Sequence, residues 1–231
     1  MMLQVKDLNI GYEKREILSG LNFSIGRGEL IGLVGSNGVG KSTLLKTLTG
    51  NLKPLSGEVN VDGKALPLIP QQELSKLISI VLTDKLGGFN LTVFDIVAAG
   101  RIPYLSAFGQ LTEKDIEVIQ ESLETIGIKQ LSGNYFDELS DGQKQKVLIA
   151  KSLAQQTPVI LMDEPTAFLD FDSRQKLFQI LKKLVKEQHK TIIVSSHDLE
   201  VLFRNVDEVL YLKGNKDYHF ESPDKIKTFF L

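Results

Sequence analysis

Cysteine is absent from the 231-residue sequence, which excludes disulfides, thiolate metal ligands and a cysteine nucleophile. No apolar run approaches the roughly 20 residues that a membrane-spanning helix needs, and the first residues lack the apolar stretch of a signal peptide. The net charge of −2 gives no electrostatic reason to expect a nucleic-acid partner. Length and composition suit one large globular domain, or a core with one inserted subdomain. Any membrane association must therefore depend on another protein.

A glycine-rich run, Gly35-Ser36-Asn37-Gly38-Val39-Gly40-Lys41-Ser42-Thr43, fits the pattern of a phosphate-binding P-loop. It follows an apolar run that predicts a buried strand and precedes a run that predicts a helix. Glycines let backbone N–H groups face a triphosphate, and the helix N-terminus adds its positive dipole. The pattern predicts that Lys41 contacts the β- and γ-phosphates and that Ser42 binds Mg²⁺. The alternative is a glycine-rich turn that binds nothing.

Strand-like and helix-like runs alternate along most of the chain. Strands are expected at 3–10, 21–25, 29–34, 58–63, 78–82, 159–162 and 191–195. Helical patterns cover 92–156 and 173–188. We therefore expect an α/β fold with a P-loop NTPase (RecA-like) core, N-terminal antiparallel β strands and an inserted α-helical subdomain. The whole chain, 1–231, is expected to form a single domain, with its catalytic core at 1–88 and 157–231 and the helical subdomain at 89–156.

Polar side chains follow two of the predicted strands where each strand ends. Asp163, directly after the apolar run at 159–162, is suited to hold Mg²⁺ with its water shell. Glu164 is suited to orient or deprotonate an attacking water. His197 follows the run at 191–196 and is suited to contact a γ-phosphate. The alternatives are a solvated Asp-Glu pair and a surface histidine.

A further motif, Leu139-Ser140-Asp141-Gly142-Gln143, precedes a strongly helical run. Ser140 is placed as an N-cap, and Gly142 allows close approach of a phosphate. The motif resembles the LSGGQ signature of ABC ATPases, with Asp141 where that family usually has glycine. The order of the P-loop, the signature, Asp163-Glu164, the D-loop-like Ala167-Phe168-Leu169-Asp170 and His197 is similar to that family from about residue 3 to 212.

The resemblance implies an ATPase that works as a nucleotide-sandwich homodimer with two ATP molecules. Ser140, Gly142 and Gln143 would then contact ATP bound to the P-loop of the second copy, and Asp170 would communicate between the two sites. Tyr12 matches the aromatic residue that stacks on adenine; the alternative is a half-buried strand tyrosine. Thr83 stands where the family has the Q-loop glutamine, and its shorter side chain offers a hydroxyl oxygen to Mg²⁺.

The segment from Asn90 to Tyr104, which includes Gly100-Arg101-Ile102-Pro103, resembles one found in ATPases of iron-siderophore, haem and vitamin B12 (cobalamin) importers. The alternative is an ordinary amphipathic core helix. The resemblance implies a subunit that powers such uptake through separate polytopic permease subunits at the cytoplasmic face of the cell membrane. It also implies an indirect partner, the substrate-binding protein. Other possibilities are the ATPase of a divalent-metal importer or an exporter, and a soluble ABC ATPase acting on ribosomes or DNA.

Overall fold

The computed structural model describes residues 1–13, 15–82, 90–106 and 109–230. Two sheets are present in these ranges: an antiparallel sheet in the order β2-β1-β4-β5 and a larger sheet in the order β10-β9-β3-β8-β7-β6. The strands are β1 Leu3–Tyr12, β2 Arg15–Ile25, β3 Leu30–Gly35, β4 Ser56–Val61, β5 Lys64–Ala65, β6 Ile78–Val81, β7 Val159–Met162, β8 Thr191–Ser195, β9 Glu208–Gly214 and β10 Asp217–Glu221. The α-helices are α1 Lys41–Leu48, α2 Gln71–Leu77, α3 Val93–Ala98, α4 Glu113–Ile126, α5 Asp141–Ala154, α6 Phe171–Gln188, α7 Leu199–Phe203 and α8 Pro223–Lys227, and a 3₁₀-helix, η2, covers Ala99–Tyr104.

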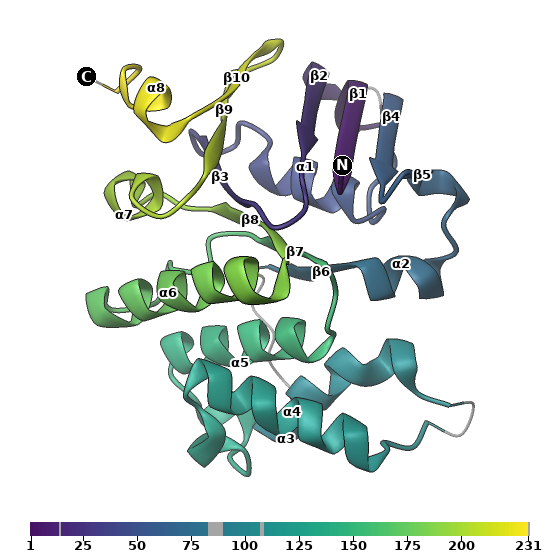
Figure 1. The fold of residues 1–231 in the computed structure, drawn as a ribbon, viewed down its shortest axis with the longest axis vertical. Coiled ribbons are helices and arrows are strands. Elements are labelled where there is room, and N and C mark those ends of the chain that lie inside the picture. The colour runs from purple at the N-terminus through teal and green to yellow at the C-terminus, as the bar shows by residue number, and fades with distance from the viewer. Residues whose placement is uncertain (14, 83–89, 107–108, 231) are drawn as a thin grey trace.

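The larger sheet is buried on both faces, and its side chains alternate between two hydrophobic clusters. In β3, Ile31 and Leu33 pack with α1 and the antiparallel sheet, whereas Leu30 and Val34 pack on the opposite face with α5, α6 and α7. This alternation follows from the two-residue period of a strand. Helix α1 therefore lies between the two sheets, and Figure 1 shows it beside the antiparallel strands, with α3, α4 and α5 at the other end of the molecule.

In the described part of the larger sheet, β3, β6, β7, β8 and β9 run parallel to one another, and β10 pairs antiparallel with β9. The carboxyl ends of parallel strands meet at one edge of a sheet, where ligands of α/β proteins commonly bind. The P-loop follows β3, Asp163 follows β7 and His197 follows β8. The topology thus brings these three segments to the same edge.

Helices α3, α4 and α5 share a hydrophobic cluster of their own, which includes Val97, Ile119 and Val147. Arg101 of η2, just 3% exposed, links η2 to α4 and α5. It donates to Asp115 Oδ1 of α4 at 2.9 Å, to the Ala154 carbonyl oxygen of α5 at 2.7 Å and to Gln156 Oε1 at 3.0 Å. Its guanidinium also lies 4.1 Å from the centre of the Tyr104 ring. The Gly100–Tyr104 segment is therefore an internal brace of the helical region.

The predicted fold class is confirmed in its α/β character, its N-terminal antiparallel strands and its helical insertion. Strands β7 and β8 begin and end where the sequence predicted. The elements that were not predicted include β5, α2, α7, β9, β10 and α8. The subdomain boundaries at 88/89 and 156/157 stay a prediction, and residues 88 and 89 lie outside the described ranges.

Candidate functional site

The glycine-rich run folds as a tight turn from β3 into α1. At Gly35, with φ of 157°, a Cβ atom would lie 2.5 Å from the Leu212 carbonyl oxygen. At Gly40, with φ of 118°, it would lie 2.8 Å from Ile17 of β2. A side chain at either position would clash and strain the backbone, so glycine is required. The loop therefore ends at the N-terminus of α1, where backbone N–H groups and the helix dipole favour a phosphate.

Lys41 is held inside this turn. Its Nζ donates to the Gly35 carbonyl oxygen at 2.8 Å and to the Ser36 carbonyl oxygen at 3.2 Å. Burial lowers the pKa of Lys41, and the charges of Glu164 and Asp163 oppose that effect. An ammonium group has three donors, so a third remains for an anion. Ser42, the next residue, is exposed on the first turn of α1.

Ser195, which no sequence pattern indicated, links the end of β8 to the residues that follow β7. The buried Ser195 hydroxyl donates to Asp163 Oδ1 at 2.8 Å and accepts from the Glu164 backbone N–H at 2.8 Å. Asp163 itself is 5% exposed. These bonds fix the carboxylate of Asp163 and the backbone of Glu164 together. The sequence showed only a hydroxyl at a strand end, a position without a recognisable pattern.

Glu164 and His197 form a close pair beside them. The distance from His197 Nε2 to Glu164 Oε1 is 2.7 Å, and the side chains are 49% and 30% exposed. Glu164 has φ of 49°, in the left-handed region that a non-glycine residue enters only at an energetic cost. Strain of this kind is often found at functional sites. The pair is thus held open to solvent in a fixed geometry.

The signature-like segment begins α5 and lies apart from the P-loop. Ser140 caps the helix in a capping box, because its hydroxyl accepts from the Gln143 N–H while Gln143 Oε1 accepts from the Ser140 N–H. Among the residues that the structure describes, no hydrogen bond joins 140–143 to 35–43. Asp170 similarly caps α6 by accepting from the Ser173 N–H at 2.7 Å, which lowers its pKa.

Two further predicted residues lie outside this cluster. Tyr12 ends β1 and is 48% exposed, which fits both an adenine-stacking ring and a half-buried strand tyrosine, so its role stays a prediction. Its strand pairs with β2, which packs against the P-loop through Ile17. Thr83 lies outside the described residues.

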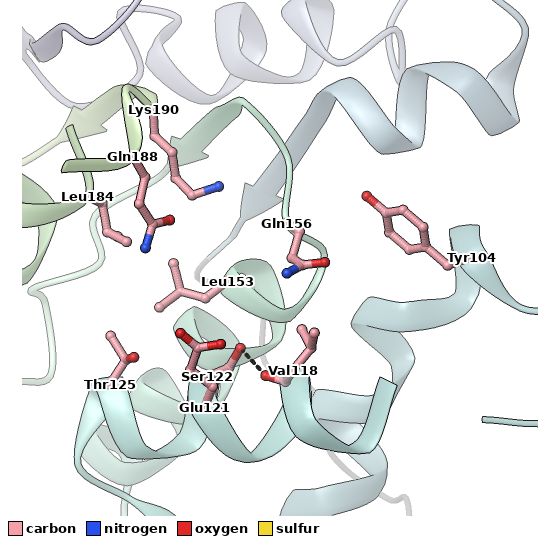
Figure 2. Close-up of a pocket in the computed structure, with 10 residues that line it drawn as sticks. All are labelled: Tyr104, Val118, Glu121, Ser122, Thr125, Leu153, Gln156, Leu184, Gln188 and Lys190. Atoms are coloured by element: carbon pink, nitrogen blue, oxygen red, sulfur yellow. Dashed lines mark hydrogen bonds between the residues drawn. The ribbon is translucent and has the colours of Figure 1, made fainter. Parts of the chain in front are cut away.

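One space lies beside the loops that follow β7 and β8, and a larger cavity lies elsewhere. A space of about 290 Å³ is lined by Glu164, Thr166, Ala167, Arg174, His197 and Asp198. A cavity of about 500 Å³ opens between α4, α5 and the end of α6, with Leu153 at its centre and Tyr104 and Lys190 on opposite sides (Figure 2). None of the predicted site residues lines the larger cavity. Lys41, Asp163, Glu164 and His197 instead lie where β3, β7 and β8 end, at one edge of the larger sheet.

Comparison with known proteins gives a family match and curated relatives. The family described as "ABC transporter" matches residues 18–167. An uncharacterised ABC transporter ATP-binding protein, MJ0873 of Methanocaldococcus jannaschii, is 40% identical over 97% of this chain and 78% of its own. The iron(3+)-hydroxamate import ATP-binding protein FhuC of Bacillus subtilis is 37% identical over 91% of this chain and 78% of its own. The cobalamin import ATP-binding protein BtuD of Halobacterium salinarum is 32% identical over 99% of this chain and 57% of its own.

Solved structures give the same fold. One is an inward-facing conformation of a putative metal-chelate type ABC transporter, with a TM-score of 0.85 and 28% identity over 97% of this chain and 84% of that one. Another is the dimeric structure of MJ0796, a bacterial ABC transporter cassette, with a TM-score of 0.83 and 29% identity over 94% of this chain and 98% of that one. These neighbours confirm the P-loop NTPase fold predicted from the sequence.

Proposed function

The chain belongs to the ABC transporter family and is an ATP-hydrolysing subunit of the ABC type; from this premise we propose that it powers import of an iron-siderophore, haem or cobalamin-type substrate. The observation that carries the proposal is the similarity, over nearly the whole chain, to ATP-binding subunits of hydroxamate-iron and cobalamin importers. The substrate would pass through separate permease subunits, and this chain would act at the cytoplasmic face of the membrane. None of the helices among the described residues is long and apolar enough to cross a bilayer.

The chemistry of the site fits MgATP. The described residues contain no cluster of three or more His, Cys, Asp or Glu side chains that could hold a metal alone. Mg²⁺ does not require one, since it is commonly held by one or two protein oxygens, substrate phosphates and waters. We assign the protein oxygens to Ser42 and to Asp163, which Ser195 orients. Bound Mg²⁺ would neutralise the phosphate charge that develops during hydrolysis.

The residues around the phosphates then have separate roles. Lys41 and the N–H groups of the P-loop would bind the β- and γ-phosphates, with Lys41 already oriented by Gly35 and Ser36. Glu164 would orient and deprotonate the attacking water through the carboxylate oxygen that His197 does not occupy. His197 would hold the Glu164 side chain in place and approach the γ-phosphate.

The signature residues would complete the site from a second copy of the chain. Ser140, Gly142 and Gln143 make no hydrogen bond with the P-loop of their own chain in the part that the structure describes, and they begin a capped helix whose N-terminus suits a phosphate. In a homodimer with two ATP molecules between its subunits, the signature helix of one copy would bind the phosphate at the P-loop of the other copy. This arrangement accounts both for the capped N-terminus of that helix and for its lack of hydrogen bonds, among the described residues, to its own P-loop. ATP binding would close this dimer, and hydrolysis and product release would open it.

A second surface is suited to the permease. A cavity of about 210 Å³ lies where α2, β6, α5 and the residues after α1 meet, and β6 directly precedes the region of the Q-loop position. Among the described residues that line it, Lys151 alone is charged. Burial lowers the pKa of Lys151. We assign the permease contact to this cavity and to its rim.

The test is a pull-down of tagged Glu164→Gln protein with MgATP from detergent-solubilised native membranes, read by mass spectrometry. Lys41→Ala protein, which should not form the ATP-bound dimer, is the matched control. Recovery of a polytopic membrane protein in near-equal amount, dependent on ATP, would support the import proposal. Recovery of ribosomal or DNA-bound proteins without a membrane protein would contradict it.

A further inference from the structure

Arg174, in the first turn of α6, contacts two loops of the candidate site. Its Nε donates to the Leu169 carbonyl oxygen at 2.8 Å, and its Nη1 donates to Asp198 Oδ2 at 3.2 Å. The two partners lie on different segments: Leu169 directly precedes Asp170 in the D-loop, and Asp198 directly follows His197. A planar guanidinium can donate in both directions at once, whereas an ammonium group is a single compact charge.

Asp198, one partner of Arg174, is adjacent in sequence to His197, which contacts Glu164. Asp198 Oδ1 accepts from the Val201 N–H and caps α7, and the Asp198 N–H donates to Ser196 Oγ at 3.1 Å. The backbone on both sides of His197 is therefore anchored, and His197 Nε2 lies 2.7 Å from Glu164 Oε1. Arg174, His197 and Glu164 line the same space of about 290 Å³. A shift of Asp198 would move the His197 ring relative to Glu164.

Leu169, the other partner of Arg174, lies in the D-loop, which packs against the signature segment at Gly142. A Cβ atom on Gly142 would lie 2.8 Å from the Phe168 carbonyl oxygen, so α5 packs backbone to backbone against the D-loop. Lys146 Nζ of α5 also donates to Ser173 Oγ of α6 at 3.0 Å. The start of α5, the D-loop and the first turn of α6 thus form one packed unit. In the dimer proposed above, that unit faces the ATP of the second copy.

We propose that Arg174 is a positioning residue that transmits the placement of the signature and D-loop of this chain to its own His197–Glu164 pair. The inference rests on the proposed dimeric ATPase. When the signature binds the ATP of the partner subunit, the D-loop is fixed, and Arg174 fixes Asp198 and the His197 ring in turn. Occupation of one site thereby favours hydrolysis at the other.

Arg174 is expected to contribute little to the stability of the fold, so its positioning role can be tested separately. Arg174 and Asp198 are 34% and 27% exposed, and ion pairs near the surface contribute little to stability. Removal of Arg174 should therefore leave a folded protein. The chain also supplies a matched control in Arg204, which forms an ion pair with Glu200 at α7, with side chains 69% and 75% exposed. Among the described residues, no hydrogen bond or ion pair joins the Arg204 side chain to either loop.

The experiment compares wild type with Arg174→Gln, Arg174→Lys and the control Arg204→Gln. Steady-state ATP hydrolysis is measured across ATP concentrations to give kcat and the Hill coefficient. Binding of a fluorescent ATP analogue and the thermal midpoint are measured on the same samples. We expect both Arg174 variants to lose roughly 3- to 30-fold in kcat, with a Hill coefficient near 1 and wild-type binding and thermal midpoint. Arg204→Gln should match wild type throughout.

A double-mutant cycle tests whether Arg174 acts through Asp198. Asp198→Asn keeps an oxygen that can cap α7 but removes the charge that faces Arg174. We expect the Arg174→Gln and Asp198→Asn losses in kcat to be non-additive. Additive losses, or an Arg174→Gln variant with wild-type kcat and Hill coefficient, would overturn the role of Arg174 and leave the proposed ATPase function standing. Parallel loss of nucleotide binding and thermal midpoint would also overturn it, in favour of a structural role. A wild-type chain without ATP hydrolysis would overturn the proposed function itself.

Discussion

Replacement of Arg101 by methionine tests the brace that holds the helical region together. Methionine keeps an apolar stem of similar length but removes every donor. The bonds to Asp115, the Ala154 carbonyl oxygen and Gln156 are then lost at a site where Arg101 is 3% exposed. Removing one partner of a buried ion pair costs about 3–5 kcal/mol. That is a large part of the 5–15 kcal/mol expected for the whole fold.

The assay is urea unfolding at pH 7, followed by circular dichroism, with Arg204→Met as the control. Arg204 pairs with Glu200 on the surface, where an ion pair contributes about 0–1 kcal/mol. We expect Arg101→Met to lower the free energy of unfolding by about 3 kcal/mol or more and Arg204→Met by less than about 1 kcal/mol. Equal, small losses in both variants would refute the idea that Arg101 braces the helices.

The same site predicts a pH dependence. Hydrogen bonds from the hydroxyl and backbone N–H of Thr112, together with one hydrogen bond from Arg101 and the charge of Arg101, lower the pKa of Asp115 from 3.8 to about 2. Because the folded-state pKa is depressed, this stabilisation is present above the unfolded-state pKa and is lost as the pH falls from about 4 towards 2. It corresponds to about 2 kcal/mol at most. The stability difference between wild type and Asp115→Asn should therefore shrink between pH 5 and pH 2.

The remaining predictions concern the nucleotide. Lys41→Ala should weaken ATP binding at least about 10-fold, as expected for loss of a charge-assisted hydrogen bond; unchanged affinity in a calorimetric titration would contradict the P-loop assignment. Tyr12→Ala should weaken ATP binding at least about 5-fold through loss of stacking, whereas Tyr12→Phe should retain affinity; equal affinities would remove Tyr12 from the adenine site. Thr83→Gln should leave basal hydrolysis intact; its collapse would show that Thr83 takes part in the chemistry.

Most of the larger sheet could be predicted because its strands are short apolar runs with both faces buried. In β7, for example, Val159 and Leu161 pack on one face and Ile160 and Met162 on the other. The strand β10 was missed because its sequence, Asp-Tyr-His-Phe-Glu, mixes charged and aromatic residues at the sheet edge. Helix α2 was missed because its seven residues, Gln-Gln-Glu-Leu-Ser-Lys-Leu, are mostly polar and too few to show a helical apolar period.

The positions of the site segments were predictable, but the contacts between them were not. Local motifs set the P-loop, the Asp163-Glu164 pair and the capped signature helix. The partners of Arg174 and Arg101 are instead brought together by tertiary folding: Asp198 is 24 positions from Arg174, and Ala154 is 53 from Arg101. No spacing rule links such residues in one sequence. The Gly100–Tyr104 segment was noted only for its resemblance to importer ATPases, whereas the structure gives it a bracing role.

The most direct test of the account is the behaviour of Glu164→Gln with MgATP. Phosphate release and light scattering after size exclusion are measured on wild type and on this variant. We predict that Glu164→Gln binds ATP, loses about 10²–10⁴-fold in turnover and elutes with ATP at twice the 25.7 kDa mass of the chain. Wild-type turnover in the variant, or a monomer at saturating ATP, would contradict a dimeric ATPase in which Glu164 activates the attacking water.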